Sequence, residues 1–151
     1  MKTMLTAIAL AATLAQPAAA ITFPSLTTIY VGAGAFSVGN DLSGTATVVV
    51  CSNVSGVAAS IRVLMLNDNG GIEGQATVTT GHGGSEVFFT HPIIPFGGED
   101  LQTGSFIGVI NIEATQSGVF CTARIMNGEG PAQDAAPLDL VRVNPHPGTV
   151  E

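Results

Sequence analysis

The sequence contains very little positive charge. Four Lys and Arg residues stand against eleven Asp and Glu, and the formal net charge is −7. The one lysine is Lys2, so beyond residue 20 three arginines face eleven carboxylates, a net charge of −8. Binding to nucleic acids or anionic membranes relies on clustered Lys and Arg. We therefore exclude both as partners and interpret the acidity as a source of solubility rather than as a cation site.

Long apolar runs are absent beyond the N-terminus. Lys2 precedes an apolar stretch at residues 4–14, and Gln16-Pro17-Ala18-Ala19-Ala20 follows, which is the pattern of a secretory signal peptide. The stretch is about eleven residues, whereas a membrane-spanning helix needs roughly 20. We predict cleavage after Ala20, a mature start at Ile21, and a periplasmic or extracellular protein without a membrane span.

Cysteine is also scarce. Cys51 and Cys121 are the two in the chain, 70 positions apart. In an exported protein such a pair indicates one disulfide, worth about 4 kcal/mol on the chain-entropy model. Free thiols or a metal pair are the alternative, but neither cysteine has ligand-type residues at zinc-site spacing. The absence of a C-x-x-C motif indicates a structural bond rather than a redox-active one.

No segment beyond residue 20 sustains a helical period, while short runs rich in Val, Ile, Thr and Phe alternate with Gly, Asn, Asp and Pro clusters. This pattern predicts an all-β protein, an antiparallel β-sandwich (immunoglobulin-like or related) of about seven to eight strands with one disulfide. One domain is expected over residues 21–143, followed by an extended tail at 144–151. The expected strands are 26–31, 45–52, 58–66, 74–80, 85–90, 105–114, 119–126 and 138–143, and residues 131–137 are expected to form a loop.

Alternation of side chains predicts which faces point inward. One face of the run 105–114 carries Phe106, Ile110, Ile112 and Ala114. One face of the run 119–126 carries Val119, Cys121, Ala123 and Ile125. The short link 115–118 predicts a hairpin between these two runs. Around Cys51 the alternation is unclear, which indicates either a strand covered on both faces or a bulge.

The common catalytic motifs are missing: the chain has no G-x-S-x-G and, without lysine after Lys2, no S-x-x-K. We predict no catalytic residue and no cofactor. His82 and His91 are weak candidate metal ligands. They flank the strand 85–90, and nine extended residues span about 30 Å, too far for two imidazoles on one ion. Each is interpreted as a loop histidine.

Three polar motifs have alternative interpretations. Residues 67–71, Asn-Asp-Asn-Gly-Gly, predict a hairpin turn and match a calcium loop only poorly. Glu99 and Asp100 are interpreted as an acidic loop tip, because adjacent residues point apart and cannot form a glycosidase dyad. Asn53-Val54-Ser55 matches the N-glycosylation acceptor, but the short signal is typical of bacteria, where we interpret the match as accidental.

Four segments together resemble short exported bacterial proteins of no assigned activity. They are Cys51-Ser52-Asn53, Thr90-His91-Pro92, Phe120-Cys121-Thr122-Ala123 and the terminal run 142–151. The resemblance implies export and paired cysteines. It carries over no fold, substrate or site residue.

Three functional classes remain open. The first is a non-catalytic binding or structural module of the envelope or extracellular space, which contacts a partner through loops or a sheet edge, with 26–31 and 138–143 as the expected edge strands. The second is a hydrolase with a dispersed site including His91, Glu99 and Asp100. The third is a metal-binding envelope protein that uses His82 and His91. We favour the first.

Overall fold

The structure is a computed structural model that describes residues 25–39, 43–92, 97–127 and 135–143. The expected signal segment 1–20, its cleavage site and the tail 144–151 lie outside these ranges. Within them the secondary structure is entirely β, with no helix of the length and apolar character needed to cross a membrane.

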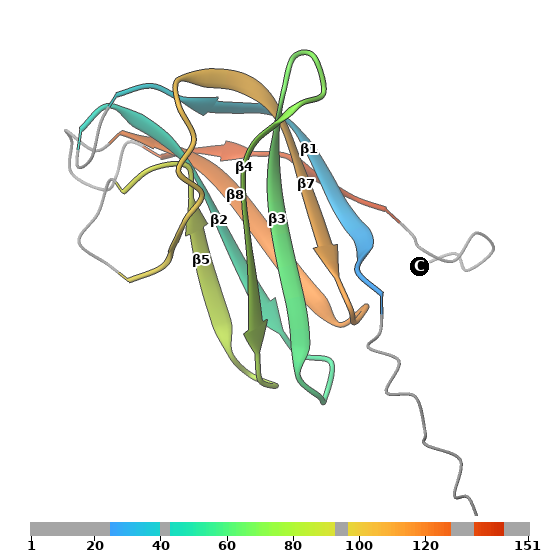
Figure 1. Ribbon diagram of the computed structural model, residues 1–151. Helices are drawn as coiled ribbons and strands as arrows, with labels where there is room; N and C mark the ends of the chain where they lie inside the picture. The colour runs from blue at the N-terminus through green and yellow to red at the C-terminus, as the bar shows by residue number, and fades with distance from the viewer. Residues whose placement is uncertain (1–24, 40–42, 93–96, 128–134, 144–151) are drawn as a thin grey trace, which may run out of the picture.

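The described residues form two packed five-stranded sheets, which confirms the all-β sandwich (Figure 1). The first has the order β10-β1-β7-β3-β4 and the second β6-β5-β2-β8-β9, and every neighbouring pair is antiparallel except β5–β6. The strands are β1 Thr27–Ser37, β2 Thr45–Asn53, β3 Ala59–Asn67, β4 Ile72–Thr80, β5 Ser85–Phe89, β6 Glu99–Asp100, β7 Phe106–Ala114, β8 Val119–Asn127, β9 Ala135–Leu138 and β10 Leu140–Arg142.

The main hydrophobic core lies between the inner faces of the two sheets. The expected alternation in β7 is confirmed, since Phe106, Ile110, Ile112 and Ala114 are all buried. The second sheet contributes Val49, Cys51, Phe88, Val119 and Ala123. Each large apolar side chain buried here contributes about 1.5–3 kcal/mol relative to exposure, so this interface dominates the stability of the fold.

Strand β2 is covered on both faces. Cys51 faces the main core, while Ala46 and Val48 join Phe89 in a second apolar cluster. The register of β2 with β5 and β8 runs without a shift. The unclear pattern around Cys51 therefore reflects a central strand packed on both sides, not a bulge.

Strand β1 is an interior strand, so the expectation that residues 26–31 form a sheet edge is wrong. β10 pairs with one side of β1 and β7 with the other. The strand also continues past its glycines to Ser37, because Gly34 adopts a φ of +83° at a register shift that keeps the pairing going. In the sequence, Gly32 and Gly34 indicate the end of a strand, whereas in the structure Gly34 lies at a bulge within β1.

The link 115–118 does not form the expected hairpin, because β7 and β8 belong to different sheets. The chain instead passes from one sheet to the other there, so the apolar faces of both strands point into the core between the sheets. The turn at 67–71 does form a hairpin, between β3 and β4. Gly70 there has a φ of +78°, a conformation that glycine adopts without strain.

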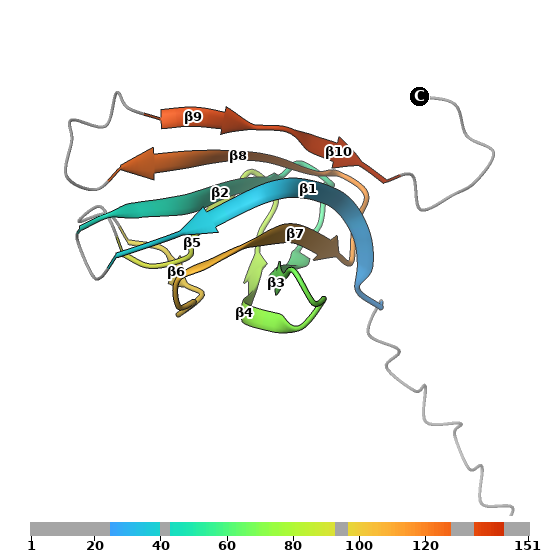
Figure 2. The same cartoon turned by 90° about the horizontal axis from the view of Figure 1, so that it is seen from above.

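The C-terminal strand changes sheets, where the sequence predicted one strand at 138–143 and a loop at 131–137, of which residues 131–134 lie outside the described ranges. β9 pairs with β8 in the second sheet, the chain bends at Asp139, and β10 pairs with β1 in the first. Figure 2 shows this segment running along one side of the molecule. The sequence did not predict β9 because Pro137 argues against a strand there, although proline is tolerated in edge strands such as β9.

Residues 135–142, which form β9 and β10 and are called the switching segment below, end in a cation–π contact that we call the Arg142 clamp. The Arg142 guanidinium carbon lies 4.9 Å from the Phe120 ring centroid and 5.6 Å from that of Tyr30. Its Nη2 donates a hydrogen bond of 2.6 Å to the Ser117 carbonyl oxygen. Because Phe120 belongs to β8 and Tyr30 to β1, Arg142 ties both sheets together on this side.

Candidate functional site

The disulfide joins directly opposed residues of β2 and β8. Cys51 and Cys121 form a register pair, with their Cα atoms 4.1 Å apart, which confirms the expected bond. In antibody domains the conserved bridge joins the two sheets, whereas this one lies within a single sheet. Cys51 is fully buried and Cys121 half-buried. The bond staples two central strands and presents no free thiol for chemistry.

His91 is a buried structural residue. It is 6% exposed, and its Nε2 lies 3.0 Å from the Ser43 carbonyl oxygen. Because a carbonyl only accepts, Nε2 carries the proton, and in the neutral ring Nδ1 accepts the hydroxyl proton of Ser37 at 3.0 Å. The ring thereby holds the end of β1 and the start of the β2 region against the segment after β5.

Ser37 and His91 are the residue types of a catalytic nucleophile and its general base, but a substrate could not reach them in this structure. Ser37 is 2% exposed, and the second ring nitrogen of His91 is held by a backbone carbonyl. The other two residues of the hydrolase hypothesis, Glu99 and Asp100, form β6 rather than a loop tip, and pair with Phe88 and Phe89 of β5. Asp100 Oδ1 accepts a hydrogen bond from the Gln102 N–H.

His82 lies at the other end of β5, in the turn that follows β4. It is exposed, and its Nδ1 accepts the Gly56 N–H at 3.1 Å. Among the residues that the structure describes, no three His, Cys, Asp or Glu side chains gather as a metal site. The metal hypothesis therefore has two histidines with separate partners at opposite ends of a strand.

Asn53 has a structural role that the sequence did not reveal. It is fully buried, and its amide nitrogen donates to the carbonyls of Val57 at 2.7 Å and Thr80 at 3.0 Å. Its Oδ1 accepts from the N–H and hydroxyl of Ser55. The side chain is inaccessible for glycosylation in the folded protein. The usable signal was the Asx-turn pattern Asn-x-Ser, which the glycosylation motif obscured.

Asn67 performs a similar task in the β3–β4 turn. Its Oδ1 accepts the N–H groups of Asn69 at 3.1 Å and Gly71 at 2.8 Å, and its amide donates to Glu73. The side-chain oxygen that a calcium loop would direct at an ion is thus used to shape the turn.

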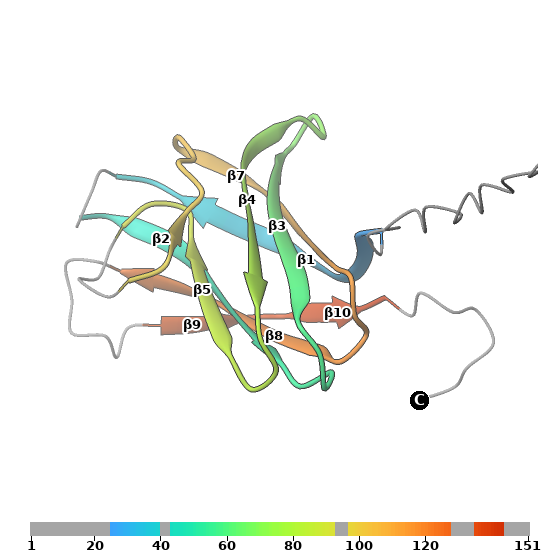
Figure 3. The ribbon, with the colours of Figure 1, turned by 60° about the horizontal axis from the view of Figure 1, so that its bottom comes forward.

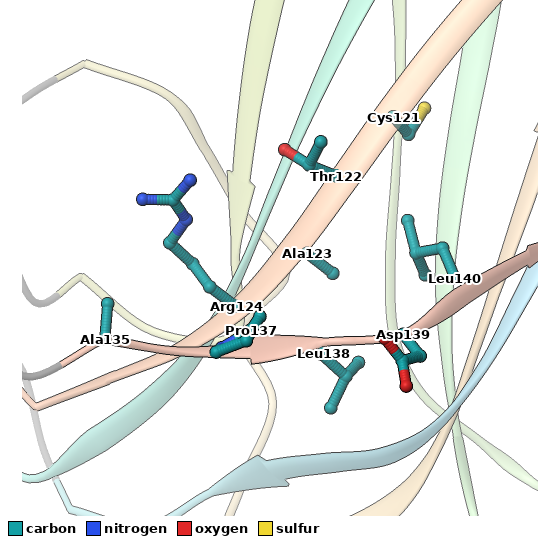
Figure 4. Close-up of a pocket in the computed structure, with 9 residues that line it drawn as sticks. All are labelled: Cys121, Thr122, Ala123, Arg124, Ala135, Pro137, Leu138, Asp139 and Leu140. Atoms are coloured by element: carbon teal, nitrogen blue, oxygen red, sulfur yellow. The ribbon is translucent and has the colours of Figure 1, made fainter.

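A cleft of about 530 Å³ lies where the switching segment leaves the second sheet (Figure 4). Its lining comes from β8 and from the β9–β10 segment: Cys121, Thr122, Ala123, Arg124, Ala135, Pro137, Leu138, Asp139 and Leu140. Arg124 and Asp139 are its charged residues, and the Arg124 side chain extends away from Asp139. The cleft holds no imidazole, no free thiol and no pair of carboxylates.

The outermost strands of the two sheets differ in how their free edges are protected. Protein edges are usually blunted by shortness, charge or proline. β6 has two residues, and both are acidic. β9 has four residues, one of which is Pro137, and β10 has three. The charged residue Asp139 lies between β9 and β10. β4 has nine residues, contains no proline, and has a single charged residue, Glu73, near its start. Among the strands described, β4 is the longest of the outermost strands, and Figure 3 shows it beside β3.

The hydrogen bonding of β3 shows which groups of β4 face this edge. The Ser60 carbonyl accepts the Thr115 N–H, and the Ser60 N–H donates to Thr115 Oγ1, so the Ser60 backbone points away from β4. Backbone groups alternate along a strand. Ile61 and Val63 therefore bond to their β4 partners Val78 and Ala76. The three residues between and beside these partners point their N–H and C=O groups outward: Gln75, Thr77 and Thr79.

The sequence predicted two edge strands, and the edge of β4 was not among them. The expected edges were 26–31, which is interior, and 138–143, whose strands lie at the edges but form the protected switching segment. The side chains of Gln75, Thr77 and Thr79 are exposed and uncharged. Comparison with known proteins found no matching family model, no matching curated protein and no matching solved structure.

Proposed function

We propose that this protein is an exported, non-catalytic module that binds by adding an extended strand to the edge of β4. The observation that carries the proposal is the contrast in edge protection, since β4 is the longest of the described outermost strands and carries no charge from Gly74 to Thr80. Strand addition is a general recognition mode in which main-chain hydrogen bonds provide affinity. Alternating outward groups at Gln75, Thr77 and Thr79 supply those bonds.

The separation of the polar candidates favours binding over catalysis. His91 is buried against Ser37 and Ser43, His82 contacts Gly56, and Asp100 is bonded locally. General acid–base or nucleophilic catalysis needs such groups within hydrogen-bond reach of one substrate. Here each is held by its own partner in a different part of the fold.

Export is supported by the disulfide. Stable bonds of this kind form in oxidising compartments, and the cytosol keeps most thiols reduced. The bridge between Cys51 and Cys121 joins the central strands of one sheet, where it contributes to stability only if the protein matures under oxidising conditions. The N-terminal signal pattern in the sequence agrees with this assignment.

A strand-mimicking peptide tests the proposed surface. An acetylated and amidated peptide with the sequence of residues 72–80 is titrated into the ¹⁵N-labelled mature protein. We expect the largest amide shifts at Gln75, Thr77 and Thr79, because their N–H groups gain acceptors. A control peptide with proline in place of the threonine that corresponds to Thr77 should shift them far less.

Two outcomes would overturn the proposal. One is peptide-induced shifts confined to the β8 cleft, around Thr122 and Arg124, with β4 unchanged. The other is enzymatic turnover by the purified protein in a screen of ester, peptide and glycoside substrates, abolished by substitution of His91 or Asp100 in folded variants.

A further inference from the structure

We infer that the strand added to β4 is a basic one, with an uncharged run that pairs with residues 75–79 and Lys or Arg at the end that lies beside Glu73. The inference rests on the proposed use of the β4 edge and names the chemistry of its partner. The edge supplies backbone hydrogen bonds to any extended strand. The charges around the edge select which strand binds.

The part of the sandwich that carries β4 is acidic. Five of the seven carboxylates among the described residues lie between positions 68 and 100, a stretch that contains β4, β5 and β6 and has no Lys or Arg. They are Asp68, Glu73, Glu86, Glu99 and Asp100. A surface lined by one sign of charge attracts partners of the opposite sign and raises their rate of association.

The arginines of the described residues do not offset this charge. Arg142 belongs to β10, at the opposite edge of the same sheet, and Arg124 belongs to β8 of the other sheet. Arg62 lies opposite Thr77 in the β3–β4 register, but it forms an ion pair with Glu113 of β7, and its Nε donates to Glu113 Oε2 at 2.6 Å. The Arg62 charge is thus neutralised on the side away from β4.

The negative charge gathers at the beginning of β4. Glu73 lies there, and Asp68 belongs to the preceding turn. The chain after β6 packs on the inner face of the same end, where a Cβ atom at Gly74 would approach Thr103 Cγ2 to 2.7 Å, so Asp100 lies at this end as well. Residues 75–84 carry no carboxylate. The edge therefore has an acidic beginning and an uncharged remainder.

This asymmetry gives the added strand a direction. All neighbouring strands of the sheet that ends in β4 are antiparallel, and antiparallel pairing is the slightly more stable arrangement. The C-terminal end of an antiparallel partner lies beside Glu73. Since each residue advances a strand by about 3.3 Å, a lysine one or two positions past the residue that faces Gln75 brings its ammonium group to the Glu73 carboxylate.

The same charges disfavour acidic partners, including a second copy of this chain, whose mature net charge is −8. Lysine is a common protective residue of edge strands, because like charges keep two such edges from pairing. A strand protected in this way still fits β4, where its lysine meets a carboxylate rather than another lysine. Opposite charges across neighbouring strands are favourable.

Three acetylated and amidated peptides, titrated into the ¹⁵N-labelled, disulfide-bonded mature protein, test the inference. All contain the run Thr-Val-Thr-Val-Thr. The first has two lysines after the run, the second has two lysines before it, and the third has two glutamates after it. We expect the first to shift the amides of Gln75, Thr77 and Thr79 with the lowest Kd, and the third to have a Kd about fivefold higher or more. The Kd of the first should rise as salt increases from about 0.05 to 0.5 M, because ions screen exposed charges.

Charge reversal at Glu73 tests where the lysines lie. Glu73→Lys should reverse the preference, so that the glutamate peptide binds more tightly than the first lysine peptide. Glu73→Gln retains an oxygen for the hydrogen bond from Asn67 and should reduce the preference without reversing it. Asp139→Lys is the matched control, because it makes the same charge change at an exposed residue on the far side of the sandwich, and it should preserve the preference.

Equal Kd values for the lysine and glutamate peptides, with the β4 amides still shifted, would overturn the inference and leave the proposed function standing. Reversal of the preference by Asp139→Lys would overturn it in the same way. A dimer of the protein alone that competes with the first peptide would assign the edge to a second copy and also overturn it. If none of the peptides moves the β4 amides, the proposed function fails together with the inference.

Discussion

The two lateral sides of the sandwich treat unpaired backbone in opposite ways. On one side the β9–β10 segment leaves β8 and joins β1, and Arg142 clamps it between Phe120 and Tyr30. On the other side β4 ends its sheet with a free edge of nine residues. Because an open edge invites pairing with other chains, natural proteins usually protect it. This difference between the two sides is the basis on which we propose the β4 edge as the contact surface.

The largest expected effect concerns the disulfide that links β2 to β8, the strand with which β9 pairs. Replacing both cysteines, Cys51→Ala with Cys121→Ala, should lower the free energy of unfolding by several kcal/mol, up to about 4. Urea denaturation of the exported proteins measures the difference. Ser52→Ala, which removes one hydroxyl of an exposed pair beside Cys51, should change stability by less than about 0.5 kcal/mol. Equal unfolding midpoints for wild type and double variant would contradict the structural role of the bond.

Proline substitutions at two adjacent residues distinguish the side of β4 that bonds to β3 from the side that faces outward. Ala76→Pro removes an N–H that bonds to β3 and should cost about 3 kcal/mol or more. Thr77→Pro removes an N–H that faces the open edge, where proline is tolerated, and should cost clearly less. Thermal melts of the two variants give the comparison. The reverse order of stabilities would mean that the outward-facing residues have been assigned with the wrong parity.

Asn53 fastens the far end of β4 to β2 through the Thr80 carbonyl. Asn53→Ala leaves buried partners without hydrogen bonds and should cost about 1–3 kcal/mol. Asn69→Ala, in the exposed β3–β4 turn, is the matched control and should be within about 0.5 kcal/mol of the wild type. Chemical denaturation compares the two, and similar costs would show that the buried network contributes little.

The smallest expected effect is on the clamp of the closed side. Arg142→Ala removes the contacts with two aromatic rings and the bond to the Ser117 carbonyl, and should cost about 1 kcal/mol. Arg124→Ala removes an exposed arginine from the cleft beside it and should have less effect. If calorimetry shows that Arg124→Ala lowers the melting temperature more than Arg142→Ala does, the Arg142 contacts are not what stabilises the β9–β10 segment.

Local patterns in the sequence predicted local structure well. Alternation in β7 and β8 gave the inward faces, and the Asn-Asp-Asn-Gly-Gly run gave the β3–β4 turn. Both depend on a two-residue side-chain period or on a glycine with positive φ, which are properties of adjacent residues.

The order of strands within the sheets could not be obtained in this way. Whether β1 is interior or at an edge depends on β10, which lies more than 100 positions away in the chain. The short link 115–118 is compatible both with a hairpin and with a crossing between sheets, and the packing of two apolar faces decides between them. The candidate surface was missed for the same reason, because an edge is defined by a neighbour that is absent.

Residue-resolved hydrogen exchange of the β4 amides tests whether this strand is an open edge. The measurement is made by NMR on dilute mature protein, since exchange reports how often each N–H loses its acceptor. We expect fast exchange at Gln75 and Thr79, and protection by at least a hundredfold at Ala76 and Val78, which bond to β3. Protection of all four amides to the same extent would show that the edge of β4 is already covered, which contradicts an open edge.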